Sequence, residues 1–410
     1  MAEAAGQFQK ALDQLALLPD TLERKRQELD FYIGLGAASQ TSKGFSAAET
    51  GRAYAHASEL WEQLGCPVEY LRAPMGHSGY YTNRGELELA QCLNTHILRL
   101  AYRRTEPSTR CMGHVITGRT LTFAGKFVKA RSHLEKAEAL YDQIPLRWSS
   151  QPSGLVPPVG ARGYLATILF CLGYPDQAFA KTRANIAYAS RIAHTPSITL
   201  AHIFGATLFL LLGDDIALQG EVQQVVSAAT EHGFGLYLAQ GTIFRGWLDI
   251  QRGNIPEGLH LVKSGLDAYR SMGSLVWVPQ YLGILVTAYE AAGQIEDALI
   301  AANTALQIVE RTGERWFAAE LNRHKGQLLV QSGNVGAAEE QFYEALRIAQ
   351  SQGAKLWELR AAMSLARLRR DQGRRNEACH LLRSAYGCFT EGLAVPDLRA
   401  AKKLLDELGG

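Results

Sequence analysis

The sequence predicts an all-α solenoid of helix–turn–helix units with a period of about 40 residues. Two glycine series carry this prediction. The first has steps of 40 residues and runs through Gly173, Gly213, Gly253, Gly293, Gly333 and Gly373, with Gly85 and Gly125 also 40 apart. The second, also in steps of 40, runs through Gly233, Gly273, Gly313 and Gly353. A fixed period of this size is typical of repeat architectures.

Each unit contains two stretches of about 17 residues between glycines, and both have a helical apolar pattern. In residues 339–349, Phe342, Ala345, Leu346 and Ala349 lie on one helical face. A glycine after each stretch supplies the positive φ of a helix C-cap. One glycine-rich turn before a helix can bind phosphate. Eight such turns at a fixed period instead indicate that glycine ends each helix before the next one begins. The Walker pattern is also absent from the sequence.

Small residues recur at fixed offsets within the unit. Ala338 opens a second helix, Gly326 lies twelve residues earlier, and Phe342 and Ala345 follow four and seven residues later. Small residues here let paired helices approach closely, and large ones fill the groove between repeats. The pattern resembles the tetratricopeptide repeat (TPR), whose usual unit has about 34 residues. It predicts a right-handed superhelical solenoid of about nine to ten helix pairs, each helix longer by most of a turn.

The period divides the chain into four predicted parts. Residues 1–140 form divergent helical repeats, 141–160 a proline-rich irregular loop, 161–391 regular TPR-like repeats, and 392–410 a capping helix. The step from Gly125 to Gly173 is eight residues longer than the others, so the loop within it is longer too. Long loops in compact arrays often carry function, but a divergent spacer that covers a groove is the favoured interpretation of this one. Trp148 and Arg147 are the residues of interest there.

Local patterns predict two further helix ends. Ser46, followed by Glu49 three residues later, has the pattern of a capping box. In the C-terminal helix one apolar stripe is expected, formed by Leu398, Ala401, Leu404, Leu405 and Leu408.

At the N-terminal end of the sequence, residues 3–12 resemble the second helix of a repeat without its first helix. We therefore expect the chain to be a fragment or split-gene product, or to begin with an atypical cap.

Bulk composition excludes several classes of partner. The formal charge is +2, from 42 basic and 40 acidic residues, so no global field favours nucleic acid or an anionic membrane. The N-terminus lacks a signal-peptide pattern. The most membrane-like run, residues 195–213, contains His202 and falls in the repeat register, which predicts a buried helix. Six scattered cysteines without a CxxC pair indicate reduced thiols and a cytoplasmic protein.

No catalytic, metal-binding or cofactor-binding motif is present in the sequence. It lacks HExxH, GxSxG and a GxGxxG that follows a strand. The arginine-rich stretch 367–375 fits either an acidic partner or the dipole at a helix C-terminus. Trp277 and Trp357, two periods apart, fit packing between repeats better than a ligand cage. We therefore expect a protein without enzymatic activity.

The predicted binding surface is formed by polar residues of the first helices, which line the concave side in this class of array. They are Arg245, Tyr281, Asn322, Arg323, Lys325 and Arg360. Periodicity alone does not fix which helix face is concave.

Several segments resemble one bacterial family beyond the repeat itself. They are "GERWFAAELNRHKGQLL" (313–329), "GAKLWELRAAMSLARLRRDQGRRNEA" (353–378), "GYPDQA" (173–178) and "PDLRAAKKLLDEL" (396–408). They are similar to the C-terminal TPR region of signalling proteins that fuse a class III adenylate/guanylate cyclase domain to a STAND-type predicted P-loop ATPase. The resemblance covers nearly the whole chain. It implies a regulatory arm whose partner is an ATPase or cyclase module, in cis or in trans, but neither activity, since this chain carries no residues of either module.

Two functions from different classes follow. The first is a non-catalytic, cytoplasmic scaffold for protein–protein interaction in signalling. The second is a solenoid that senses a small ligand. A pocket with convergent charged groups favours the second, and a broad open groove favours the first.

Overall fold

The computed structural model describes residues 2–103, 106–141, 143 and 156–409. Over these ranges the chain forms twenty α-helices and one 3-10 helix, and no β-strand. The first helices are α1 (Ala2–Leu15), α2 (Leu22–Lys43), α3 (Ala48–Gln63), the 3-10 helix (Val68–Tyr70), α4 (Arg72–Asn83), α5 (Leu87–Ala101), α6 (Pro107–Phe123) and α7 (Phe127–Tyr141). The middle helices are α8 (Pro157–Cys171), α9 (Pro175–Arg191), α10 (Thr195–Leu212), α11 (Asp215–His232), α12 (Gly235–Gln251), α13 (Ile255–Ser271) and α14 (Val278–Ala291). The last are α15 (Ile295–Thr312), α16 (Ala318–Gln331), α17 (Val335–Gln352), α18 (Lys355–Asp371), α19 (Arg375–Tyr386) and α20 (Pro396–Gly409).

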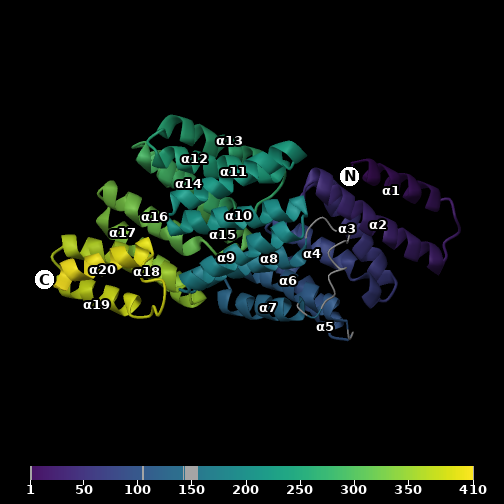
Figure 1. The fold of residues 1–410 in the computed structure, drawn as a ribbon, viewed down its shortest axis with the longest axis horizontal. Helices are drawn as coiled ribbons and strands as arrows, with labels where there is room; N and C mark the ends of the chain where they lie inside the picture. Colours follow the sequence, from purple (N-terminus) through teal and green to yellow (C-terminus); the bar gives the residue numbers. More distant parts are fainter. Residues whose placement is uncertain (1, 104–105, 142, 144–155, 410) are drawn as a thin grey trace.

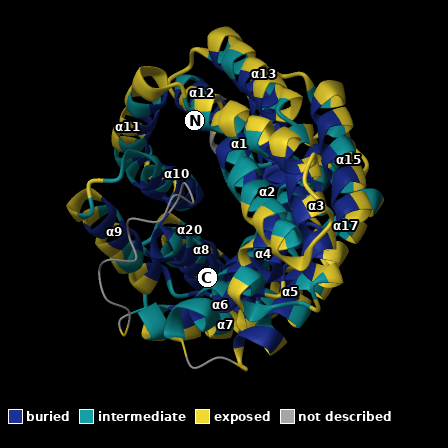
Figure 2. Cartoon of the chain, turned by 90° about the vertical axis from the view of Figure 1, so that its right-hand side faces the viewer, coloured by how far each residue is buried: buried dark blue, intermediate teal, exposed yellow. Residues whose placement is uncertain are grey.

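Consecutive helices pack as antiparallel pairs, from α2 with α3 to α18 with α19 (Figure 1). First helices also pack against the first helices of neighbouring pairs, for example α8 against α10 and α14 against α16. Viewed along its long axis, the array forms a ring in which α8 and α10 lie inside α9 and α11 (Figure 2). The predicted all-α, TPR-like solenoid is confirmed.

The periodic glycines end the helices as predicted. All twelve members of the two series have φ between 67° and 91°. Gly213, Gly233, Gly313 and Gly353 are themselves C-caps in the left-handed conformation. Only glycine adopts this conformation without steric strain, which explains why glycine recurs where each helix must stop and reverse.

The small residues lie where paired helices touch. A Cβ added to Gly326 on α16 would lie 2.5 Å from the Cε1 atom of Phe342 on α17. Ala338 and Phe342 are both buried. In an earlier pair, a Cβ on Gly258 would lie 2.6 Å from the carbonyl oxygen of Gly246. The helices therefore approach at the offsets that the repeat frame predicts.

The most apolar helix, α10, lies within the array. It is the described helix that is long and apolar enough to span a membrane. It packs against α8, α9, α11 and α12, and eleven of its residues are buried. Its apolar surface is thus covered by neighbouring repeats, as predicted from its register.

The superhelix returns to itself and forms a contact that we call the inter-turn seam. We define the seam as residues 44–47, 83–86, 123–126 and 170–177 against residues 273–277, 313–317, 352–357 and 389–392. The backbone N–H of Leu275 donates to the Asn83 carbonyl at 2.9 Å, and that of Arg315 donates to the Phe123 carbonyl at 2.8 Å. Each bond joins two loops that lie almost half the chain apart in the sequence. The C-terminal repeats therefore lie directly against the N-terminal ones.

Aromatic side chains fill the inter-turn seam. The rings of Phe123 and Trp277 meet edge to face with centroids 5.1 Å apart, and those of Phe170 and Trp357 do so at 6.2 Å. Gly125, with φ 69°, leaves room for the opposite turn, because a Cβ there would lie 2.5 Å from the side-chain Nε2 of Gln352 and 3.3 Å from the backbone carbonyl carbon of Arg315. Trp277 and Trp357 are buried. They serve packing, between turns as well as between repeats.

Three expectations from the sequence need comment here. The predicted capping box at Ser46 is wrong: α3 is capped at Ala47 without a side-chain bond, and the Ser46 hydroxyl lies 2.9 Å from that of Ser274 across the seam. The final helix α20 buries Leu398, Ala401, Leu404 and Leu408, while Leu405 is half-buried. Of the predicted irregular loop 141–160, residues 157–160 are the first turn of α8. Arg147 and Trp148 lie outside the described residues.

A buried carboxyl group lies within the inter-turn seam. Glu314 has no exposed surface, and its Oε1 accepts the backbone N–H of Trp277 at 2.9 Å and the indole N–H of Trp316 at 3.0 Å. Its Oε2 has no hydrogen-bond partner among the described residues. Burial raises the pKa of Glu314 to about 8, against the opposing effect of the two donors. The carboxyl is therefore protonated in the folded protein at neutral pH.

This geometry predicts a pH-dependent stability difference between the wild type and Glu314→Gln. In the unfolded chain Glu314 loses its proton near pH 4.5, whereas in the folded chain it does so near 8. Rising pH through this window therefore favours unfolding of the wild type but not of the neutral variant. We expect the Tm difference, variant minus wild type, to grow from pH 5 to pH 8.5 in thermal melts. A difference that stays constant with pH would contradict a buried, protonated carboxyl.

Candidate ligand-binding pocket

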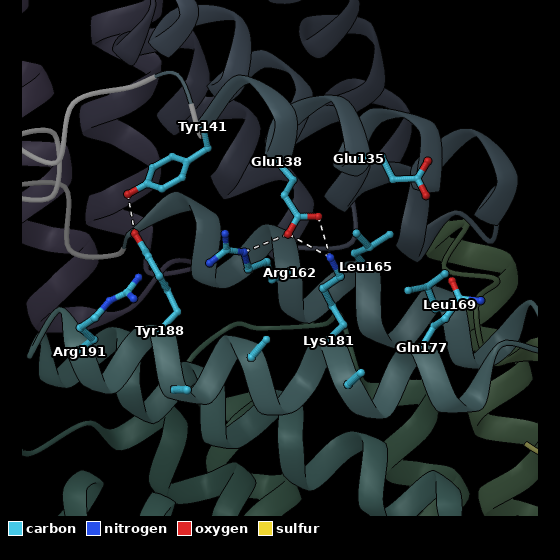
Figure 3. Close-up of a pocket in the computed structure, with 13 residues that line it drawn as sticks. Glu135, Glu138, Tyr141, Arg162, Leu165, Leu169, Gln177, Lys181, Tyr188 and Arg191 are labelled. Carbon is cyan, nitrogen blue, oxygen red and sulfur yellow. Dashed lines mark hydrogen bonds and ion pairs between the residues drawn. The ribbon is translucent and has the colours of Figure 1, made fainter.

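A pocket of about 860 Å³ opens between α7, α8 and α9 (Figure 3). Helix α8 forms its floor, and the second helices α7 and α9 form its walls. Its lining residues are Glu135, Glu138 and Tyr141 from α7, Arg162, Leu165 and Leu169 from α8, and Gln177, Ala180, Lys181, Ala184, Ala187, Tyr188 and Arg191 from α9. The volume lies in the range of small-molecule sites.

An ion-pair network crosses the middle of the pocket. Glu138 accepts the Nε–H of Arg162 at 3.1 Å and two contacts from the Lys181 ammonium, at 2.8 and 3.0 Å. The three side chains come from three helices and are mostly buried. One carboxylate therefore fixes two cations in place, which preorganises both for a ligand.

Two tyrosines and two arginines form one end of the pocket. The hydroxyls of Tyr141 and Tyr188 are hydrogen-bonded to each other. The guanidinium of Arg162 lies 4.5 Å from the Tyr188 ring centroid, and that of Arg191 lies 5.5 Å from it. Burial, followed by the hydrogen bond from Tyr188, raises the pKa of Tyr141. The Tyr141 hydroxyl therefore remains a neutral hydrogen-bonding group at physiological pH.

The other end of the pocket has an apolar floor. Leu165 and Leu169 form this floor and are almost fully buried, while Glu135 and Gln177 lie at the same end (Figure 3). Ala180, Ala184 and Ala187 line α9 along the length of the pocket, at the spacing of one helical face. Small side chains there leave the groove between α7 and α9 unfilled.

The pocket touches the inter-turn seam at Gln177. Its backbone N–H donates to Oε1 of Glu391 at 3.1 Å, and its side-chain amide donates to Oε2 at 2.7 Å. Beside it, Asp176 accepts the backbone N–H of Gly392 at 2.9 Å. One wall of the pocket is thus joined to the C-terminal end of the array.

The structure does not bring the six sequence-predicted site residues into one surface. Tyr281 is buried, and its hydroxyl accepts the amide N–H of Gln240 at 2.6 Å. Asn322 is also buried, and its amide donates to the carbonyl oxygen of Ala318, one turn earlier in α16. Tyr281 therefore contacts the neighbouring first helix α12, and Asn322 bonds within its own helix, and neither side chain is exposed.

Arg323 and Arg360 belong to a buried ion network around Glu320. Arg323 donates to Glu320 at 2.8 and 2.9 Å, and Arg360 donates to it at 3.1 Å. Arg360 also pairs with Asp397 of α20 at 2.8 Å and donates to the Leu211 carbonyl across the turns. Arg360 therefore joins α18 to α16, α20 and α10.

The remaining two predicted residues are accessible. Arg245 on α12 is exposed, and Lys325 on α16 is half-buried. The arginine-rich stretch at the end of α18 is largely paired with glutamates, as in the contacts of Arg374 with Glu377 at 2.7 Å and of Arg370 with Glu407 at 3.3 Å. A binding role for any of the six residues stays a prediction.

Sequence reasoning missed the pocket residues, although one signal pointed to the region. The longer step between Gly125 and Gly173 spans α7 and α8, which form two sides of the pocket. Glu138, Arg162 and Lys181 are far apart in the sequence and match no motif. The most specific sequence signal for the pocket was the three exposed alanines of α9. They occupy positions where the exterior of a helix usually carries long polar side chains.

Groups that could hold a metal do not cluster in the described part of the chain, where no three His, Cys, Asp or Glu side chains come together. His114 and His133 form a pair with Nδ1 atoms 3.0 Å apart, and Tyr102 bonds the other side of His114 at 2.9 Å. Burial, then the nearby His133, lowers the pKa of His114 to about 4. The pair is therefore neutral at physiological pH and serves packing between α5, α6 and α7.

The fold defines the class of this protein: it is a TPR-like helical-repeat solenoid. No family model matches the chain. It is 25% identical over 373 residues to the uncharacterized protein R02095 of Rhizobium meliloti (strain 1021), a match that covers 90% of this chain. The chain spans 36% of the length of that relative.

Solved structures share the fold at low sequence identity. The APC/C subunit Cut9, in its hetero-tetramer with Hcn1, has a TM-score of 0.54 at 15% identity and covers 97% of this chain, with 65% of its own length matched. The Rap conjugation gene regulator of plasmid pLS20, in complex with the Phr* peptide, has a TM-score of 0.53 at 10% sequence identity. The match covers 93% of this chain and 96% of that one. The apo quorum sensor NprR from B. thuringiensis has a TM-score of 0.52 at 13% identity, and the match covers 89% of this chain and 99% of that one. These similarities show the fold alone.

Proposed function

We propose that this chain is a non-catalytic scaffold that binds a protein partner and regulates it. The observation that carries the proposal is the array itself, a solenoid of stacked helix pairs of the kind that presents extended binding surfaces. The similar structures include a quorum sensor, a gene regulator bound to a peptide and a subunit of a hetero-tetramer. Their roles support a binding function for this solenoid.

The resemblance of the C-terminal motifs leads to the finer proposal. We propose that the partner is a P-loop ATPase or cyclase module, in cis or in trans, and that the chain acts as its regulatory arm in signalling. Free cysteines and near-neutral charge support a cytoplasmic location and argue against nucleic acid or a membrane as partner.

A pull-down of the tagged chain from its source lysate, followed by mass spectrometry, tests this proposal. We expect a protein with a P-loop ATPase or cyclase module to be recovered. Charge reversal at the two accessible cations of the predicted set, Arg245→Glu and Lys325→Glu, is expected to reduce its recovery, because both lie on first helices and neither is in an ion pair within the described part of the chain. Arg183→Glu, an exposed arginine of the outer helix α9, is the matched control. Recovery of background proteins alone would contradict the partner-binding proposal.

A second candidate function is the sensing of a small ligand, and the pocket between α7 and α9 favours it. Its charged groups converge from three helices, its volume suits a small molecule, and Gln177 joins it to the seam. In this proposal the ligand changes the contact that Gln177 makes with the last repeat, and a partner reads that change.

A further inference from the structure

The charges that line the pocket between α7 and α9 are unequal. Glu135 is already held by Arg131, outside the pocket, at 2.7 Å. Glu138 is shared by two cations, Arg162 and Lys181. Arg191 has no carboxylate within ion-pair distance in the described part of the chain; its guanidinium lies over Tyr188 instead. The pocket therefore presents surplus positive charge and leaves none of its carboxylates unpaired.

The pocket is also polarised along its length. It follows α9 from Gln177 to Arg191, a rise of about 21 Å for an α-helix. The two arginines and the tyrosine hydroxyls gather at the Arg191 end, whereas the leucine floor begins beyond the Glu138 network (Figure 3). The alanines of α9 form a narrow apolar strip that runs from the Arg191 end, past Lys181, to the leucine floor. A complementary ligand is long and narrow, with one anionic end and an apolar remainder.

We propose that this pocket binds an alkyl carboxylate. The carboxylate pairs with the guanidinium of Arg191 and accepts a hydrogen bond from the Tyr188 hydroxyl, and Arg162, against the same tyrosine ring, adds positive charge. The alkyl chain covers Leu165 and Leu169 and lies along the α9 alanines. A carboxylate matches the guanidinium fork in geometry and charge, and the apolar wall supplies the area that a hydrocarbon chain needs to leave water. This inference rests on the ligand-sensing candidate above.

Three variants separate the roles of charge and space. Arg191→Ala removes the unpaired cation from an exposed position, so the fold is expected to remain intact. Ala184→Trp fills the pocket from an exposed site on α9. Arg183→Ala is the matched control, since Arg183 is also an exposed arginine of α9 that stacks on an aromatic ring, that of Phe179, at 4.9 Å, but it does not line the pocket.

The experiment is isothermal titration of the full chain with dodecanoate below its micelle concentration, with dodecanol as the uncharged probe. We expect dodecanoate to bind the wild type and Arg183→Ala equally. Its affinity should fall about tenfold in Arg191→Ala, the loss of one charged hydrogen bond, and binding should disappear in Ala184→Trp. Dodecanol should bind about tenfold more weakly than dodecanoate. Circular dichroism melts establish that each variant is folded.

Three results would overturn the inference: no heat of binding with the wild type, equal affinity for dodecanol, or unchanged affinity in both pocket variants. Failure here is distinct from failure of the scaffold function. If Ala184→Trp still captures the partner in the pull-down while dodecanoate does not bind the wild type, the partner-binding function stands and the carboxylate site does not.

Discussion

Replacing Glu320 with alanine is expected to lower the free energy of unfolding by about 3–5 kcal/mol, because it leaves Arg323 and Arg360 without their shared carboxylate in a buried site. Glu320 is 1% exposed. Burial raises its pKa, but the two arginines outweigh that effect and hold the pKa at about 2. The carboxylate is thus ionised at all physiological pH values. Its removal leaves Arg323 without its carboxylate partner and leaves Arg360 paired with Asp397 alone.

Urea unfolding followed by circular dichroism measures this effect. Glu344→Ala is the matched control: Glu344 also pairs with an arginine three residues along its helix, Arg347, but that pair is exposed. Exposed pairs of this kind contribute little, so no resolvable change is expected. Equal shifts for the two variants would show that the Glu320 network does not stabilise the fold. The wild type should also lose the Glu320 contribution as the pH falls from about 4.5 toward 2.

A single methyl group at Gly258 is the second change with a large expected effect. Alanine usually stabilises a helix interior relative to glycine by about 1 kcal/mol. At Gly258 on α13, however, the added Cβ would lie 2.6 Å from the Gly246 carbonyl oxygen and 2.9 Å from the Ile250 backbone nitrogen of α12. Backbone atoms cannot rotate aside, so the two helices must separate. We expect Gly258→Ala to destabilise the protein by about 1–3 kcal/mol.

Gly220→Ala provides the control of opposite sign. Gly220 lies inside α11, and a Cβ there would meet no atom within 4 Å. The same substitution should therefore raise the Tm slightly through helix propensity alone. If both variants change the Tm in the same direction, close approach of the backbones is not what selects glycine at position 258.

The repeat frame favours small residues at positions 246 and 258, because close helix approach leaves a direct mark on the sequence. Gly246 and Gly258 occupy the same frame positions as Gly326 and Ala338, which lie two periods later. The C-caps and the apolar stripe of the last helix were predictable for the same reason: each depends on a conformation or a face set by local sequence.

The binding surface was harder to predict because it depends on how repeats are arranged in three dimensions. The repeat period gives the position of Tyr281 within its helix, but not whether that face meets solvent or the neighbouring pair. Ser46 likewise has the local pattern of a cap, yet it contacts Ser274 because the superhelix brings two distant loops together. The pocket requires three side chains from three helices, and no spacing rule relates them.

The inter-turn seam also changes how this array should respond to local unfolding or to a destabilising substitution in one repeat. In an open solenoid each repeat interacts only with its sequence neighbours, so unfolding behaves as a one-dimensional process and terminal repeats fray. Here Asn83 and Phe123 bond to residues nearly five units further along, and Gln177 holds Glu391 near the C-terminus. The repeats therefore form a small two-dimensional lattice. A defect in one unit weakens a second, distant unit as well, and the later repeats are anchored against fraying by the first half of the chain.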